Sequence, residues 1–210
     1  MSGKISAQKM KRIVADICAI DPKFIRTVEE SPLCTVGRSA GESSHFESLV
    51  ESVISQQLAI KAADTIHARL VSLAKGKVTP PRIAKISLED LRAAGVSGAK
   101  AKTIHGLARA ALDGEISFEE LHLIENDQEI FDQLTSLWGI GPWTVDMFMM
   151  FQLGRLDVWP TGDLGVRRGW EKIHRLKEQI EPKTLEIKGE RFRPHRSVVA
   201  WYCWRAVDSN

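Results

Sequence analysis

The chain has 210 residues, of which 43% are hydrophobic and 27% are charged, and its formal net charge is only +2. This composition allows one compact domain or two small lobes with a substantial core, and it excludes an intrinsically disordered chain. The near-neutral balance excludes a globally basic nucleic-acid binder, so any basic surface must be local. Cys18, Cys34 and Cys203 lie far apart, which argues against a disulfide framework and favours a reducing compartment.

No apolar run is long enough to cross a membrane, and the N-terminal residues lead into an amphipathic pattern. We therefore expect a soluble, intracellular protein without a membrane partner. The sequence also contains no four-cysteine cluster and no Cys/His pattern with zinc-ligand spacing.

Apolar residues recur at helical spacing through most of the chain, and Gly, Pro and Ser mark the breaks. In chain order, the expected helices cover residues 5–20, a short segment from Pro22, 46–54, 58–73, a short helix after Ser87, 102–112, 117–123, 127–137, a helix from Pro142, 163–174 and 194–207. In the helix that Ser87 caps, Leu88, Leu91 and Ala94 are expected to face inward.

Two stretches, 31–41 and 75–81, are expected loops, and Pro182 marks a turn. Residues 186–192 are the only candidate strand. The pattern as a whole predicts an all-α protein of about ten helices joined by short connections.

The Gly139-Ile140-Gly141 turn lies between two expected helices, the second of which opens with Pro142. Glycine allows a sharp turn with positive φ and a close approach of another backbone. The free N–H groups and the dipole at the start of the second helix favour a negative partner, such as a DNA phosphate, without reading base sequence. The alternative is an ordinary corner between two helices, which the turn alone does not exclude.

Asp163 follows a Pro160-Thr161-Gly162 loop and begins the next expected helix. It is either a catalytic carboxylate that the loop presents or a plain helix N-cap. The residues by themselves do not separate these two roles.

Two other segments allow both a structural and a DNA-binding interpretation. Gln56 and Gln57 interrupt a helix, either as exposed turn residues or as a loop that probes DNA. Ser97 and Lys100 belong to a smaller helix-turn-helix and either contact phosphate or form an ordinary capped helix with an exposed lysine.

Together, these motifs resemble the alkylpurine (3-methyladenine) DNA glycosylases of the helix-hairpin-helix superfamily. The resemblance extends from about Phe46 to Arg205 and rests on four motifs in family order, namely Ser55–Leu58, Leu137–Thr144, the Pro160 loop with Asp163, and Arg196-Ser197 followed by Trp201–Trp204. It implies two α-helical lobes with an active-site cleft between them and the hairpin at its mouth. One lobe would comprise residues 1–42 and 153–210, and the other residues 43–152, with the helix-hairpin-helix at about 127–152.

The resemblance also assigns roles to single residues. Asp163 matches the catalytic aspartate, and Trp143 and Trp204 match aromatic residues of the base pocket. Gln57 matches the wedge that fills the gap left by a flipped nucleotide, where other members have Leu. Met147 stands where some relatives carry a third pocket aromatic, which implies a more open pocket.

Further DNA contacts are expected along the hairpin and at the two helix junctions. The expected DNA-binding set is Gln56, Gln57, Ser97, Lys100, Gly139, Ile140, Gly141 and Pro142. Many relatives have Asp or Ala where this chain has Gly162. A glycine at this position is expected to loosen the loop before Asp163.

Three other tryptophans, Trp138, Trp170 and Trp201, are expected to pack in the core.

Trp143 occupies the position at which strand-cleaving members of the superfamily carry a nucleophilic lysine. The resemblance therefore implies a monofunctional enzyme without lyase activity. It implies no cofactor, no metal bound by side chains and, at most, a structural monovalent cation on backbone carbonyls of the hairpin.

The implied reaction is the excision of 3-methyladenine and 7-methylguanine from double-stranded DNA. Alkylation makes the base cationic, so one carboxylate that stabilises positive charge on the sugar is sufficient. We expect a monomer in the cytoplasm or nucleoid, or in the nucleus of a eukaryote. The alternatives are a glycosylase for uracil, hypoxanthine or mismatched thymine, a non-catalytic binder of damaged DNA, and a helical protein scaffold.

Overall fold

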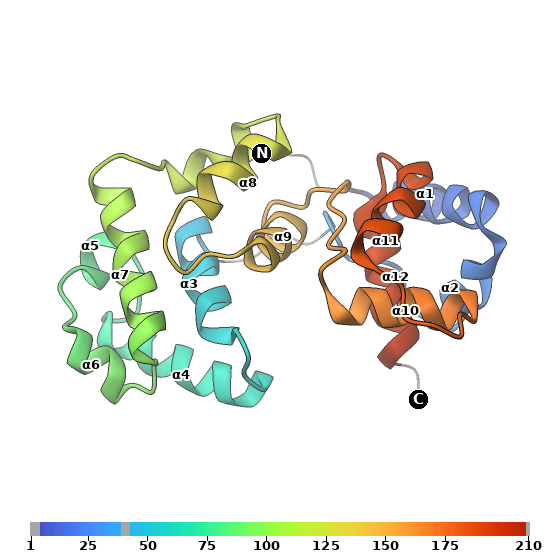
Figure 1. The fold of residues 1–210 in the computed structure, drawn as a ribbon. Coiled ribbons are helices and arrows are strands. Elements are labelled where there is room, and N and C mark those ends of the chain that lie inside the picture. Colours follow the sequence, from blue (N-terminus) through green and yellow to red (C-terminus); the bar gives the residue numbers. More distant parts are fainter. Residues whose placement is uncertain (1–4, 39–42, 209–210) are drawn as a thin grey trace. The chain divides into compact units, whose positions relative to one another are not determined.

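In a computed structural model, residues 5–38 and 43–208 are described, and they form twelve α-helices and three 3-10 helices (Figure 1). No strand occurs in these two ranges, so the all-α prediction is confirmed. The described residues cluster into two compact units. Unit 1 contains residues 43–148, and unit 2 contains residues 5–38 and 149–208.

Unit 1 is a helical bundle whose central helix, α3, buries one apolar face against α4, α7 and η2. Its elements are α3 (His45–Ser55), α4 (Ile60–Leu73), α5 (Pro80–Ile83), α6 (Leu88–Ala93), α7 (Gly98–Leu112), η2 (Phe118–Leu123), α8 (Asp127–Thr135) and most of α9 (Pro142–Phe151). Serine caps begin three of these helices, because the hydroxyl oxygens of Ser44, Ser87 and Ser97 each accept a bond from a backbone N–H three residues later.

Unit 2 combines the N-terminal helices with the C-terminal part of the chain. Its elements are α1 (Ala7–Ile20), η1 (Pro22–Phe24), α2 (Ile25–Glu29), the end of α9, α10 (Leu164–His174), α11 (Pro182–Gly189), η3 (Glu190–Phe192) and α12 (Arg196–Asp208). Helix α12 is buried over most of its length and packs closely against α10. Gly169 of α10 lies directly against the backbone of Cys203 of α12.

The fold differs from the sequence-based expectation in several segments. Residues 186–192 are not a strand, because α11 and η3 continue through them. Pro182 opens α11 as its first residue instead of marking only a turn. Leu88 was expected to face inward, but it is 42% exposed, whereas Leu91 of the same short helix is buried.

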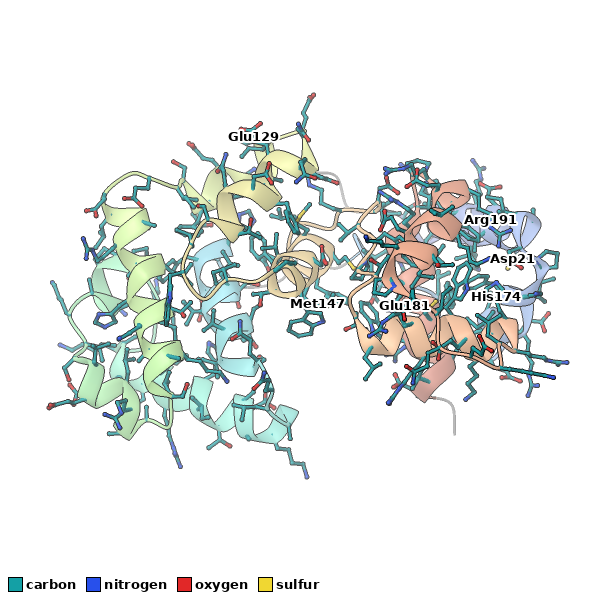
Figure 2. All side chains as sticks on the ribbon, in the orientation of Figure 1. Asp21, Glu129, Met147, His174, Glu181 and Arg191 are labelled. Atoms are coloured by element: carbon teal, nitrogen blue, oxygen red, sulfur yellow. The ribbon has the colours of Figure 1, made fainter. Side chains whose placement is uncertain are left out.

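A buried carboxylate connects three elements of unit 2, as Figure 2 shows for Asp21, His174 and Arg191. Asp21 Oδ2 lies 2.8 Å from His174 Nε2 and also accepts from the Arg191 guanidinium, while its Oδ1 accepts from the Lys23 N–H at 3.1 Å. Burial raises the pKa of Asp21, but the hydrogen bonds from His174 and Lys23 and the nearby cations outweigh this effect, and the pKa is lowered overall. The His174 ring stacks on Trp170 at 4.0 Å. The cluster therefore joins the end of α1 to α10 and η3.

Candidate functional site

The helix-hairpin-helix turn begins at Gly139, three residues after Ser136, the C-cap of α8. Gly139 has φ +83°, a left-handed conformation that favours glycine, and Ile140 is buried beneath the turn. A methyl group at Gly139 would lie 2.0 Å from Thr103 Oγ1 of α7, whereas one at Gly141 would meet no atom within 4 Å. Gly139 therefore allows the hairpin to pack on α7, and Gly141 leaves open space at the start of α9.

The two glycines provide a matched test of the hairpin. Gly139→Ala is expected to lower the free energy of unfolding by about 1–3 kcal/mol, because the new methyl group is strained at positive φ and clashes with Thr103. Gly141→Ala should leave stability nearly unchanged, since its added methyl group meets open space. Urea unfolding of both variants measures the difference. Equal stability of the two variants would contradict the packing of the turn on α7.

The loop after α3 is connected to the hairpin by side-chain hydrogen bonds. The Gln56 amide donates to Thr144 Oγ1 at 3.0 Å, and Gln57 is exposed with φ +56°. Lys100 Nζ donates to the carbonyl oxygens of Ile54 and Gln56 at 2.8 and 2.7 Å, so its ammonium group is used inside unit 1. Burial lowers the pKa of Lys100.

Two tryptophans of the hairpin are exposed. Trp143 of α9 is 43% exposed, and Met147 lies one helical turn further on, half-buried (Figure 2). Trp138 was expected in the core, but it is 64% exposed because it lies in the short turn after α8. The same expectation is confirmed for Trp170 and Trp201, both of which are buried.

Asp163 is the N-cap of α10, and the same oxygen accepts two hydrogen bonds. Its Oδ1 accepts from the Val166 N–H at 2.8 Å and from Trp204 Nε1 of α12 at 2.8 Å. The N-terminal end of the α10 dipole stabilises the negative charge at this position. The cap role is therefore present in the structure, and the indole bond, from a residue 41 positions away, additionally fixes the carboxylate.

Two residues beside Trp204 were not predicted from the sequence. The Phe151 ring lies 5.8 Å from that of Trp204, with an interplanar angle of 32°, and Phe151 is 45% exposed. A methyl group at Gly165 would lie 2.8 Å from Trp204 Cδ1 and 3.1 Å from Asp163 Oδ1, so glycine leaves the space that the indole occupies. The usable signal for Phe151 was its spacing, because it follows Met147 by four residues on α9.

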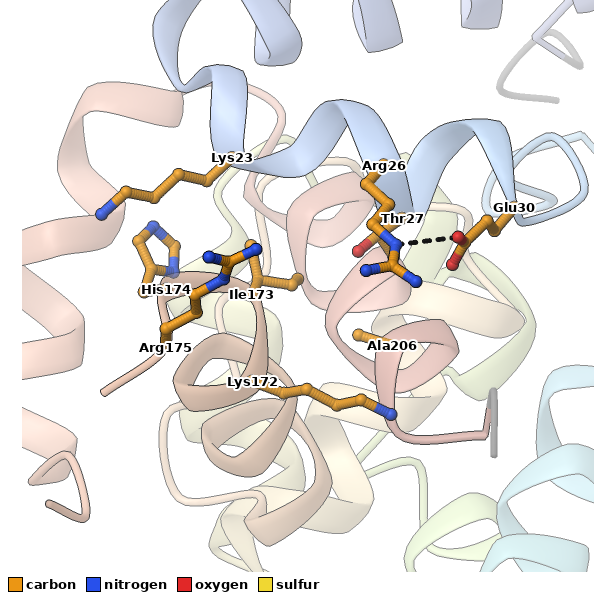
Figure 3. Close-up of a pocket in the computed structure, with 9 residues that line it drawn as sticks. All are labelled: Lys23, Arg26, Thr27, Glu30, Lys172, Ile173, His174, Arg175 and Ala206. Carbon is orange, nitrogen blue, oxygen red and sulfur yellow. Dashed lines mark hydrogen bonds and ion pairs between the residues drawn. The ribbon is translucent and has the colours of Figure 1, made fainter. Parts of the chain in front are cut away.

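A cavity of about 410 Å³ lies at the opposite end of α10 from Asp163 (Figure 3). Its charged lining residues are Lys23, Arg26, Glu30, Lys172, His174 and Arg175. Lys172 lies in the last turn of α10, where a cation is stabilised by the negative end of the helix dipole, and Arg26 pairs with Glu30 at 2.8 Å. Helix termination and an ion pair thus account for much of this basic lining.

The described part of the chain contains no cluster of three or more His, Cys, Asp or Glu side chains suited to a metal ion. Within the same part, no helix is both long and apolar enough to span a membrane. Cys18, Cys34 and Cys203 are free thiols, as the sequence predicted, and burial raises the pKa of Cys34 to about 12.

The described residues combine an all-α fold, a Gly-Ile-Gly-Pro hairpin and a carboxylate at the N-terminus of α10, which is the combination that the resemblance to the helix-hairpin-helix DNA glycosylases implies. Residues 50–194 match the HhH-GPD superfamily of base excision DNA repair proteins. The chain belongs to this superfamily.

The protein is also similar to individual members with known names or structures. It is 36% identical over 192 residues to DNA-3-methyladenine glycosylase 1 of Schizosaccharomyces pombe, covering 90% of this chain and 84% of the relative. The crystal structure of a DNA-3-methyladenine glycosidase from Bacillus halodurans superimposes with a TM-score of 0.83 at 34% identity, over 94% of this chain and 89% of the other. The S. pombe 3-methyladenine DNA glycosylase in complex with abasic DNA gives a TM-score of 0.75 at 33% identity, over 88% and 89% of the two chains.

Proposed function

We propose that the protein is a monofunctional DNA glycosylase that releases 3-methyladenine and 7-methylguanine from double-stranded DNA by hydrolysing the N-glycosidic bond. The observation that carries this proposal is the Asp163 carboxylate at the N-terminus of α10, held by Trp204 Nε1 at 2.8 Å. The similarity to a named DNA-3-methyladenine glycosylase over 90% of the chain supports the substrate class.

In the proposed reaction, the C1′–N bond to the alkylated base breaks and its electron pair leaves with the base. Positive charge develops on the sugar, and the Asp163 carboxylate stabilises it and orients or deprotonates the attacking water. Because N3- or N7-alkylation makes the base cationic, the base leaves without a strong general acid. One carboxylate is therefore sufficient for this reaction.

The proposed base-binding surface is aromatic. Trp143 and Trp204 would stack on the flipped base, and a cationic purine gains about 0.5–2 kcal/mol from each such contact. Phe151 extends the surface around Trp204, whereas Met147 replaces an aromatic ring that some relatives have. We expect this combination to favour cationic bases over neutral ones.

The proposed DNA contacts divide into two groups. The N-terminus of α9 and the Gly139–Pro142 turn would hold a backbone phosphate, and Gln57 would fill the gap left by the flipped nucleotide. Ser97 and Gln56 complete the proposed set. A monovalent cation bound to backbone carbonyl oxygens of the hairpin would also attract the phosphate. We further propose that the protein acts as a monomer, in the cytoplasm or nucleoid, or in the nucleus of a eukaryote.

A lesion panel tests the proposal. Purified protein is incubated with methylated duplex DNA and with duplexes that contain uracil, hypoxanthine or a thymine mismatch, and the released bases are measured by chromatography. We expect methylated purines to be released and the abasic strand to remain intact until alkali is added. Release of only a neutral base would show that alkylated purines are not the substrate. Binding without base release from any duplex would favour a non-catalytic DNA binder.

The absence of lyase chemistry has its own test. Because Trp143 stands where a lysine nucleophile would be, no imine should form with the abasic sugar. Borohydride treatment during turnover should therefore trap no covalent protein–DNA complex. A trapped complex would contradict the monofunctional assignment.

A further inference from the structure

The loop between α3 and α4, residues 56–59, is called the wedge loop here because it carries Gln57. Gln57 has φ +56°, a left-handed conformation that non-glycine residues rarely adopt. Such a conformation persists only where surrounding contacts hold it. Contacts near Gln57 must therefore hold the backbone of the wedge loop in this conformation.

Lys100 of α7 holds this backbone through two hydrogen bonds. Its Nζ donates to the carbonyl oxygen of Ile54 at 2.8 Å and to that of Gln56 at 2.7 Å, the second of which directly precedes Gln57. These carbonyls lie in the last turn and at the C-cap of α3. Carbonyl oxygens at the end of a helix have no N–H partner within that helix. Lys100 is half-buried, so the ammonium group gives up part of its hydration for these two bonds.

The same helix supports the hairpin one turn further on. Thr103, three residues after Lys100 on α7, lies against Gly139, where only a glycine leaves enough space. The Gln56 side chain then joins the two parts directly, through its bond to Thr144 Oγ1 at 3.0 Å. Helix α7 thus presents Lys100 to the wedge loop and Thr103 to the hairpin.

We propose that Lys100 is a positioning residue that holds the wedge loop at a fixed distance from the phosphate-binding hairpin, and that it does not bind DNA phosphate itself. In this arrangement, a phosphate contact at the hairpin places Gln57 in register with a flipped nucleotide. The proposal rests on the proposed function, because it requires that Gln57 enters the gap in the base stack. It replaces the expectation that Lys100 contacts phosphate.

The test compares two lysines of the same helix. Lys100→Met removes the ammonium group that holds the loop, whereas Lys102→Met removes the same charge from an exposed position nearby. Affinity is measured for a duplex with a tetrahydrofuran abasic analogue and for an undamaged duplex, by fluorescence anisotropy at a temperature where each variant is folded. For Lys100→Met we expect the ratio of abasic to undamaged affinity to fall by about tenfold, because two charge-assisted bonds are lost. For Lys102→Met the ratio should stay at the wild-type value.

A double variant separates positioning from a general structural effect. In the Gln57→Ala background, Lys100→Met should change the affinity ratio little further, because Lys100 acts through Gln57. Lys100→Arg, which keeps charged donors, should recover part of the ratio. If Lys100→Met does not fold, Lys100→Gln, which keeps an amide donor, is measured in the same way.

The outcomes distinguish this inference from the proposed function. If Lys100→Met weakens both duplexes equally, or if its effect adds fully to that of Gln57→Ala, then Lys100 acts as a phosphate contact or a stability element and the inference is wrong. If the wild-type protein releases no base and does not prefer abasic DNA, the proposed function itself fails. A wild-type protein that is active, with an unchanged ratio in Lys100→Met, overturns only the role of Lys100.

Discussion

Asp163→Asn is expected to lower the rate of base release by about 10²- to 10⁴-fold while DNA affinity stays close to the wild-type value. The physical reason is that the substitution removes the charge and little else. Asparagine is as good an N-cap as aspartate, and its side-chain oxygen can accept the same bonds from the Val166 N–H and Trp204 Nε1. Single-turnover excision from methylated duplex DNA, together with anisotropy titration, measures the two quantities.

Asp163→Ala is the companion variant for this prediction. It removes both the charge and the cap, so it should lose excision and also about 1 kcal/mol of stability, which Asp163→Asn should keep. Thermal unfolding of the two variants separates these contributions. Wild-type excision by Asp163→Asn would show that Asp163 is only a helix cap and would remove the central residue of the proposed mechanism.

The second large effect is expected from Gly169→Ala, at the contact between α10 and α12. A methyl group there would lie 1.9 Å from the carbonyl oxygen of Cys203, which is backbone and cannot rotate away. The two helices would have to separate, and we expect a loss of about 3 kcal/mol or more in the free energy of unfolding, at the upper end of overpacking effects. Because Trp204 follows Cys203 on α12, excision should fall as well.

Gly106→Ala is the control, and it is expected to raise the free energy of unfolding where Gly169→Ala lowers it. Gly106 lies within α7, is exposed, and has no atom within 4 Å of an added methyl group. Alanine should stabilise this helix by up to about 1 kcal/mol, because glycine is the weaker helix former. Urea unfolding of both variants compares the same chemical change in two surroundings. A stable, active Gly169→Ala protein would contradict the close packing of α10 on α12.

Local signals predicted many of the helices and the hairpin correctly. Ser87 caps its helix, Pro142 is the first residue of α9, and Gly139 takes the left-handed conformation that a sharp turn requires. Each of these features depends on backbone preferences and hydrogen bonds within about four residues. They can therefore be read from a short stretch of sequence.

Predictions that depended on burial were less successful. Trp138 is exposed although its side chain is large and apolar, and Leu88 is exposed although its spacing fits the inner face of a short helix. The segment 186–192 was too short for its periodicity to separate strand from helix. In each case the outcome depends on whether an apolar surface from a distant part of the chain lies nearby, and periodicity carries no information on that.

The sequence by itself determined the helical class, the hairpin turn and the position of Asp163 at a helix N-terminus, because these follow from local backbone chemistry. Only the tertiary structure decided that Trp204 donates to Asp163 across 41 residues, that Gly165 leaves space for this indole, and that Lys100 bonds to carbonyls 44 and 46 residues away. The physical reason is that such bonds form only when packing brings distant helices together. The type of side chain at a position does not determine which distant residue it will contact.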